Sequence, residues 1–405
     1  MKNRIILTLA AMAAALVFAA SCGKENPETV GFSEPLTKAE EGINSATNQF
    51  GFNVFHALYE KDQVLFSPLS ASLALSMTAT GANGNTASQM ISTLGFEGYT
   101  MDEVNGYFKK MVAALLTIDP NTAFEIANSL WISERANARK DFINECKKYY
   151  ASEVFPADFG SQETIDKVNK WCSDKTHGKI PSILDGPNPN MVMALMNALY
   201  FKGTWKNAFQ SDIFPGDFRT ISGTVKSVDM MYQQSELPYA EYDGFRMVEL
   251  PYGNGAFSMK VILPKEKEDF AKAVKRFDAK TLDKLRGKAT TNLVNVIMPK
   301  FTFEYKADLN DILIALGMED AFDGGKADFS KMSHDDLFIS FVKQKTFIDV
   351  NESGTEAAAV TVVAMDKNAP MDPPKTIDFT ADRPFLFVIQ ENSTGAVLFI
   401  GQKVS

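Results

Sequence analysis

The sequence FIDVNESGTEAAAVTVVAM occupies residues 347–365 and changes in character at Gly354, where a β-like run gives way to small residues. In a strand starting at residue 355, every second residue would share one face, and these are all uncharged: Thr355, Ala357, Ala359, Thr361, Val363 and Met365. That face can be buried. Gly354 before the run, and prolines at 370, 373 and 374 after it, favour an exposed connection, because glycine adds backbone freedom and proline stops strand pairing. The segment therefore suits two environments.

The composition of the whole chain is that of a large globular protein. Of its 405 residues, 45% are hydrophobic and 22% charged, which excludes a disordered or collagen-like chain. The net charge of −9 provides no positive field for phosphate backbones, so we expect no nucleic-acid partner. No linker rich in Pro, Gly or Ser follows residue 40, and we predict a single domain over residues 37–405.

Helical and strand periods alternate along this domain without a repeat of fixed length, which predicts a mixed α+β fold. Helices are expected at 37–60 and 70–80, the second after the turn Phe66-Ser67-Pro68. Several expected strands are apolar on both faces, which indicates a large sheet covered by helices. The expected strands are 125–132, 195–202, 257–263, 293–298, 338–350, 385–389 and 396–401.

The first residues have the pattern of an export signal. Lys2 and Arg4 precede an uncharged, mostly apolar run at 5–20. This run is too short for a comfortable membrane span and has the length of a signal-peptide core. We therefore expect an exported protein, located in the periplasm, on the outer membrane as a lipoprotein, on the cell surface or outside the cell.

The apolar run closes with Ala19-Ala20-Ser21-Cys22, which resembles the lipobox of bacterial lipoproteins. The resemblance implies that residues 1–22 are a signal peptide and that Cys22 carries the lipid and binds the chain to a membrane. Cleavage after Ala20 or Ser21, giving a free secreted protein, is the alternative. Residues 23–36 contain two prolines and little apolar periodicity, so we predict a flexible tether there.

Residues with catalytic or metal-binding potential are sparse. With Cys22 acylated, only Cys146 and Cys172 remain, and two buried thiols are favoured over one disulfide. The three histidines, at 56, 177 and 334, belong to no metal-spaced cluster, and no GxSxG motif is present. The sequence predicts neither an enzyme nor a protein that needs a metal or cofactor.

Five short stretches, found in order along residues 40–405, carry a family resemblance. They are Phe66-Ser67-Pro68-Leu69-Ser70, Asn197-Ala198-Leu199-Tyr200-Phe201-Lys202-Gly203-Thr204-Trp205, Met298-Pro299-Lys300-Phe301, Gly354-Thr355-Glu356-Ala357-Ala358-Ala359 and Ala381-Asp382-Arg383-Pro384-Phe385-Leu386-Phe387. Together they resemble the serpins, and the stretch from Gly354 to Ala359 resembles the proximal hinge of the serpin reactive-centre loop.

The resemblance implies a serpin fold of three β-sheets and about nine helices, with an exposed reactive-centre loop at about 354–378. In this family the loop is cleaved by a serine-type endopeptidase, inserts into the central sheet and traps the acylated protease covalently. The implied partner is thus a target protease of the serine class, with papain-like cysteine proteases as further candidates, and the chain is expected to be a monomer. A serpin-fold binding protein without inhibitory activity is the alternative; a corrupted hinge, its expected signature, is absent from this sequence.

The position of the cleaved bond follows from the usual loop length of the family. Counting from the hinge places it at Asn368–Ala369, and a register shifted by one would offer Lys367 instead. Counting back from Arg383-Pro384-Phe385 gives a bond a few residues later. We adopt the hinge count, because the length that can insert is fixed from that end.

Further residues match supporting sites of the family. Ser67, Ser70 and Asn197 match the shutter, a hydrogen-bond cluster beneath the place where the sheet opens, and Trp205 matches the breach, where the loop inserts. The usual shutter histidine falls on Gln344. Because an amide both donates and accepts, we expect the network to survive this replacement.

Overall fold

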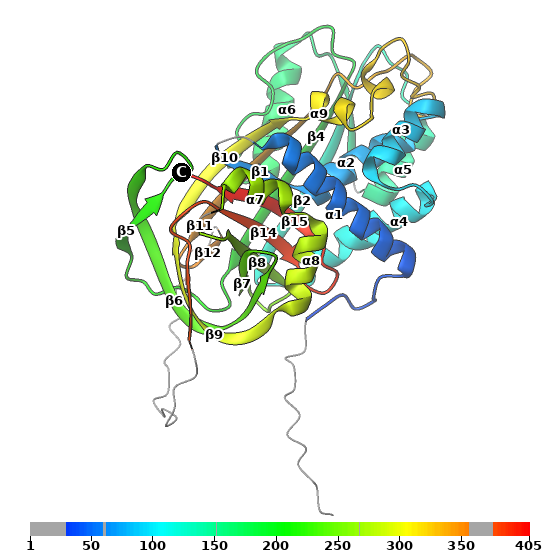
Figure 1. Cartoon of the computed structure of the whole chain (residues 1–405). Helices are drawn as coiled ribbons and strands as arrows, with labels where there is room; N and C mark the ends of the chain where they lie inside the picture. The colour runs from blue at the N-terminus through cyan, green and yellow to red at the C-terminus, as the bar shows by residue number, and fades with distance from the viewer. Residues whose placement is uncertain (1–29, 60–61, 151, 267, 356–375) are drawn as a thin grey trace, which may run out of the picture.

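A computed structural model describes residues 30–405 of the chain, except 60–61, 151, 267 and 356–375 (Figure 1). The described residues form nine α-helices, one short 3-10 helix (Asp320–Phe322) and fifteen strands. The helices are α1 (Lys38–Leu58), α2 (Pro68–Thr80), α3 (Gly84–Leu94), α4 (Met101–Leu115), α5 (Lys140–Tyr150), α6 (Gln162–Lys175), α7 (Phe270–Arg276), α8 (Ala279–Lys288) and α9 (Asn310–Ala315). The mixed α+β class predicted from the sequence is confirmed.

The strands form two hydrogen-bonded sheets. The six-stranded sheet has the order β10-β11-β12-β4-β2-β3, and the nine-stranded sheet the order β1-β15-β14-β8-β7-β6-β9-β13, with β5 paired to β6. The strands are β1 (Val64–Phe66), β2 (Thr122–Ser133), β3 (Glu153–Ala157), β4 (Met193–Thr204), β5 (Phe214–Arg219), β6 (Val225–Tyr242), β7 (Phe245–Pro251), β8 (Phe257–Pro264), β9 (Thr290–Pro299), β10 (Phe301–Asp308), β11 (Phe341–Asn351), β12 (Gly354–Thr355), β13 (Ile377–Thr380), β14 (Phe385–Glu391) and β15 (Val397–Lys403).

The nine-stranded sheet explains why two networks are found where the resemblance implied three sheets. Strand β6 is 18 residues long, and it pairs with β5 over its first part, with β9 through its middle and with β7 at its end. Figure 1 shows β6 and β9 curving around one side of the molecule, with α1 to α5 gathered on the other. The long strands therefore join two of the expected sheets into one continuous network.

Helices α1 and α2 each begin at a residue whose side chain caps the first turn. Thr37 and Glu40 form a capping box that starts α1. Ser67 is the N-cap of α2, and Pro68 occupies the first helical position, which needs no backbone N–H. The helix expected at 70–80 therefore begins two residues earlier than predicted, at Pro68. Its residues from Pro68 to Ala79 are all buried.

Strand β4 separates two hydrophobic clusters, because successive side chains point to opposite faces of a sheet. Met193 and Leu195 belong to the main core, whereas Ala194 and Met196 belong to a second cluster built with α6. The second cluster consists of Trp131, Ala157, Phe159, Ile165, Val168, Trp171, Cys172, Ile180, Ile183, Leu184, Met191, Ala194 and Met196. Helix α6 and the segment after it thus cover the face of the six-stranded sheet that points away from the main core.

The two described cysteines are free and buried, as predicted. Cys146 lies in the main core, where burial raises the pKa of its thiol to about 12. Cys172 lies in the second cluster, where burial raises the pKa of its thiol to about 11. At neutral pH both are protonated and therefore poor nucleophiles.

The segment before α1 contacts the domain over its described part. Phe32 and Leu36 pack against the main core, and the backbone N–H of Phe32 lies 3.3 Å from the hydroxyl oxygen of Ser393. Residues 1–29, including Cys22, lie outside the described residues. Within the described ranges no helix combines the length and apolar character needed to cross a membrane.

Candidate functional site

The hinge begins inside the six-stranded sheet. Thr355 pairs with Val350 of β11 on one side and with Gly203 of β4 on the other, and it is only 2% exposed. Its hydroxyl oxygen lies 2.6 Å from the hydroxyl oxygen of Tyr252. The expectation that the exposed connection starts at Gly354 is therefore wrong for its first two residues. They are held by main-chain pairing on both sides and by a side-chain hydrogen bond.

A tight turn connects β11 to β12, and its last residue, Gly354, has to be a glycine. The backbone N–H of Ser353 donates to the side-chain oxygen of Asn351, at 3.0 Å. Gly354 has a φ of 153°, and a Cβ atom there would lie 2.1 Å from the carbonyl oxygen of Gly203. No other residue fits at this position without moving β4.

Trp205 holds this turn from the β4 side. Its backbone N–H donates to the carbonyl of Ser353 and its indole N–H to the carbonyl of Asn351, both at 2.9 Å. Its ring stacks on the ring of Tyr252, with centroids 4.3 Å apart and planes inclined by 14°. The structure thus places Trp205 beside the point at which the hinge joins the sheet.

An ion pair flanks the same turn. A side-chain nitrogen of Lys300 lies 2.9 Å from a carboxylate oxygen of Glu352, and both side chains are about two-thirds or more buried. The hydrogen bond from Lys300 is the largest influence on this carboxyl and lowers the pKa of Glu352. The pair connects the start of β10 with the residue two positions before the hinge.

At the other end of β11, Gln344 takes the place that the sequence assigned to a shutter residue. Its amide oxygen accepts from the backbone N–H of Ser67 at 2.7 Å, and its amide nitrogen donates to the carbonyl of Ser67 at 3.1 Å. One amide therefore satisfies both main-chain groups at the N-cap of α2.

For the other two shutter residues, Ser70 and Asn197, the structure shows main-chain contacts. The Ser70 backbone N–H lies 3.4 Å from the Ser67 hydroxyl oxygen, and the buried Ser70 hydroxyl finds no hydrogen-bond partner among the described atoms. Asn197 pairs through its backbone with Gln344 across β4 and β11. The four shutter residues thus lie where β4, β11 and α2 meet.

The remaining predicted site residues lie outside the described residues. These are Glu356, Ala357, Ala358 and Ala359 of the hinge, Asn368, Ala369 and Lys367 at the predicted bond, and Cys22. The predicted loop boundary at 378 falls inside strand β13, which runs parallel to β9. The loop is therefore anchored by β12 at one end and by β13 at the other.

The described part of the chain offers little for catalysis. His56 lies 3.0 Å from the carbonyl of Phe277, His177 lies 2.9 Å from a carboxylate oxygen of Glu125, and His334 lies elsewhere, beside the loop before α5. No group of three or more His, Cys, Asp or Glu side chains suited to a metal ion occurs within the ranges described.

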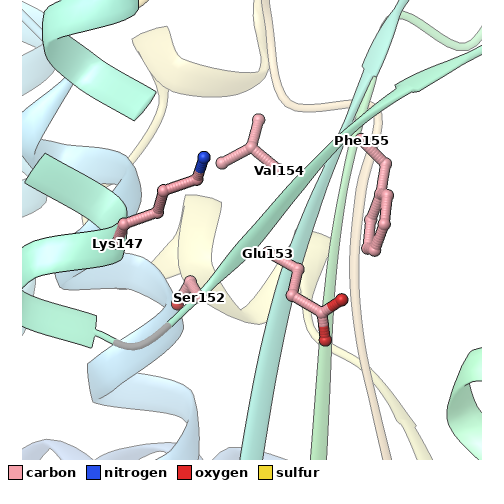
Figure 2. Close-up of a pocket in the computed structure, with 5 residues that line it drawn as sticks. All are labelled: Lys147, Ser152, Glu153, Val154 and Phe155. Atoms are coloured by element: carbon pink, nitrogen blue, oxygen red, sulfur yellow. The ribbon is translucent and has the colours of Figure 1, made fainter. Parts of the chain in front are cut away.

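A pocket of about 440 Å³ beside the edge strand β3 is no better suited to catalysis. Figure 2 shows Lys147 of α5 and Val154 on one side of this strand, and Glu153 and Phe155 on the other. The Ser152 hydroxyl, which also lines the pocket, donates to the carbonyl of Tyr150. Nucleophile, acid and base are not brought together there.

Sequence reasoning missed two residues of the site, Tyr252 and Glu352. Tyr252 directly precedes the glycine-rich turn Gly253-Asn254-Gly255, which joins β7 to β8. That signal indicates a chain reversal but gives no indication of what the tyrosine ring contacts. The Lys300 partner of Glu352 lies within one of the recognised stretches, but the pairing spans 52 residues and has no local signature.

Comparisons with known proteins agree with this geometry. A family model described as "Serpin (serine protease inhibitor)" matches residues 45–405. Leukocyte elastase inhibitor of Homo sapiens is 36% identical over 381 residues, which cover 89% of this chain and 99% of that protein. The thermophilic serpin tengpin in its native state is 34% identical, with a TM-score of 0.84 over 93% of this chain and 96% of tengpin. Thyroxine-binding globulin in complex with thyroxine is 28% identical, with a TM-score of 0.80 over 90% and 99%. The chain belongs to the serpin family.

Proposed function

We propose that the chain inhibits serine-type endopeptidases as a suicide substrate. The protease attacks the loop at Asn368–Ala369, and the serine oxygen forms an ester with the new C-terminal carbonyl while the amine side leaves. The freed segment then inserts between β4 and β11 and carries the acylated protease across the molecule before water can hydrolyse the ester. Deformation of the protease active site prevents release.

The observation that carries this proposal is the state of the gap between β4 and β11. These strands pair directly only where Phe341–Gln344 meets Ala194–Asn197. At the other end Gly354 and Thr355 lie between them and pair with both. The two strands are thus already separated by one strand at the hinge end, and the next residues of the loop follow on directly.

The observed register also suits the sequence that would follow. Continuing it by two residues from Thr355 would place Ala357 beside Ile348 and Phe201, whose side chains are buried. Two further residues would bring Ala359 beside Thr346. Small side chains at these positions present neither a charge nor excess volume to the core.

The expected driving force is large enough for the task. Each inserting residue that gains a net hydrogen bond contributes about 0.5–1.5 kcal/mol, so about a dozen residues supply on the order of ten kcal/mol before apolar burial is counted. A deformation that costs a few kcal/mol at the protease active site is within this range.

The test is a protease panel containing trypsin-, elastase- and subtilisin-like enzymes and one papain-like cysteine protease. We expect at least one serine protease to form a complex that survives denaturing electrophoresis. Mass spectrometry should then show that the released C-terminal peptide begins at Ala369, or at Asn368 if the protease attacks after Lys367. Cleavage of the loop by every enzyme without a stable complex would refute inhibition.

A non-inhibitory binding role is the second candidate, because the fold is shared with a protein solved in complex with thyroxine. Thermal unfolding separates the two. A loop that inserts after cleavage should raise the melting temperature far above that of the intact chain, whereas a loop that stays outside should leave it nearly unchanged.

We propose further that Cys22 anchors the protein to a membrane of the exporting cell. The support is the charge, length and small-residue pattern of residues 1–22. Metabolic labelling with a radioactive fatty acid tests it: the native chain should incorporate label and Cys22→Ala should not. Equal labelling of both, or a mature N-terminus at Ser21 or Cys22 without lipid, would contradict the anchor.

A further inference from the structure

The hydrogen bond between Thr355 and Tyr252 joins the two sheets at the hinge. Thr355 belongs to the six-stranded sheet, whereas Tyr252 directly follows β7 of the nine-stranded sheet, 103 positions away in sequence. Thr355 is 2% exposed and Tyr252 is fully buried. A buried hydroxyl that loses its partner carries the full cost of its lost hydration, so each of these groups depends on the other.

The Tyr252 ring is held in one place by its neighbours. It stacks on Trp205, and its centroid lies 5.1 Å from that of Phe201 in an edge-to-face contact. Its backbone N–H donates to the carbonyl of Phe257. Burial raises the pKa of Tyr252, so its hydroxyl keeps its proton at neutral pH. The ring therefore presents a fixed neutral hydroxyl to the hinge.

Residue 203 is shaped to admit this ring. A Cβ atom on Gly203 would lie 2.7 Å from the Cδ1 atom of Tyr252, closer than real Cβ contacts allow. Gly203 is also the β4 partner of Thr355. The absence of a side chain at one position thus lets the tyrosine approach the threonine that pairs there.

We propose that Tyr252 is the positioning residue that holds the hinge inside the sheet of the uncleaved chain. Its hydroxyl fixes Thr355 between β4 and β11, so the first step of loop insertion is complete before any protease arrives. Insertion after cleavage then extends an existing strand and does not have to open a closed sheet. The role of this contact in inhibition rests on the proposed function, but the position of the hinge in the resting chain does not.

Amide hydrogen exchange of the intact full-length chain, read by mass spectrometry without any protease present, tests the proposal. The variants are Tyr252→Phe, Thr355→Val and the double variant. We expect each single variant to speed exchange in the peptides that contain Gly354–Thr355 and Gly203–Thr204 about fivefold, which corresponds to the loss of one net hydrogen bond. The double variant should exchange no faster than either single variant, because both remove the same bond.

Two further variants separate this result from general loosening of the core. Tyr107→Phe removes a comparable buried hydroxyl, which donates to Asn44 at 2.8 Å between α4 and α1, and should leave hinge exchange unchanged. Thr355→Ser retains the hydroxyl and should exchange like the native chain. Unchanged hinge exchange in Tyr252→Phe, or additive effects in the double variant, would overturn the proposal.

The stoichiometry of inhibition, measured separately, distinguishes the two claims. If no protease is inhibited but the exchange pattern is as expected, the proposed function fails and the positioning role of Tyr252 stands. If inhibition occurs and the exchange pattern is absent, the function stands and the positioning role fails.

Discussion

The two ends of the gap between β4 and β11 differ in what keeps the strands together or apart. At the shutter end the strands pair directly, and Gln344 bonds both main-chain groups of Ser67. At the hinge end Gly354 and Thr355 lie between the same two strands. The same two strands are thus hydrogen-bonded to each other at one end and separated at the other by Gly354 and Thr355, which we call the wedge. Opening of the sheet is therefore a local property, set by the residues that fill or bridge the gap at each point.

The largest effect, on inhibition, is expected from a charged side chain at residue 355, which should drive the wedge out of the sheet. Thr355→Arg places a guanidinium in a site that is closed to solvent and occupied by the Tyr252 hydroxyl. We expect the hinge to leave the sheet and the chain to become a substrate, with loss of the denaturation-resistant protease complex. Thr224→Arg, at an exposed turn, is the matched control and should still inhibit. An undiminished complex with Thr355→Arg would contradict the assigned role of the hinge.

The second effect, on the stability of the fold, concerns the turn between β11 and β12. Gly354→Ala places a Cβ atom against the carbonyl oxygen of Gly203, and we expect a loss of about 1–3 kcal/mol in the free energy of unfolding. Gly98→Ala is the control, because Gly98 also has a positive φ of 89° but no atom near its added Cβ. Urea denaturation measures both. Equal losses in the two variants would mean that the contact with Gly203 does not matter.

The shutter end should tolerate a change that keeps one donor and one acceptor. Gln344→His can keep one of the two hydrogen bonds that the amide makes with the main chain of Ser67. We therefore expect inhibition to persist and the free energy of unfolding to fall by about 1 kcal/mol. Gln344→Leu leaves both main-chain groups of Ser67 without this partner and should cost about twice as much. If Gln344→His does not fold, the assignment of residue 344 to the shutter is wrong.

The smallest effect is electrostatic and depends on pH. The lowered pKa of Glu352 means that its pairing with Lys300 stabilises the fold above the pKa of the carboxyl in the unfolded chain, about 4.3, and that this contribution disappears as pH falls through the lower folded value. Glu352→Gln should therefore be less stable than the native chain by at most about 1 kcal/mol at pH 7, and this difference should shrink as pH falls below the pKa of the carboxyl in the unfolded chain. Urea titrations across this range measure it. If the stability difference between the native chain and Glu352→Gln grew as pH fell, the ionised Glu352 carboxylate would not be the stabilising form.

Much of the frame was predictable from residue patterns. The buried and half-buried alternation of β11 matches the strand expected at 338–350, and the apolar run expected at 257–263 is the buried strand β8. The start of α2 was misplaced by two residues, because Ser67-Pro68 was interpreted as a turn before the helix and not as its cap and first residue.

The state of the hinge could not be predicted in the same way. The residues from Gly354 onward suit burial and exposure equally well, so their own chemistry does not choose between them. The choice depends on Tyr252 and Gly203, which lie more than 100 positions earlier and become neighbours only after both sheets have formed. Pattern analysis within a window cannot detect a contact of this kind.

After cleavage, we expect the segment after Thr355 to extend β12 into a full strand between β4 and β11. A crystal structure of the chain cleaved in its loop tests this directly. We predict residues 355–365 paired with both strands, with Ala357 beside Ile348 and the two new chain ends at opposite poles of the molecule. A cleaved molecule in which β12 still ends at Thr355 and the two new ends remain side by side would contradict it.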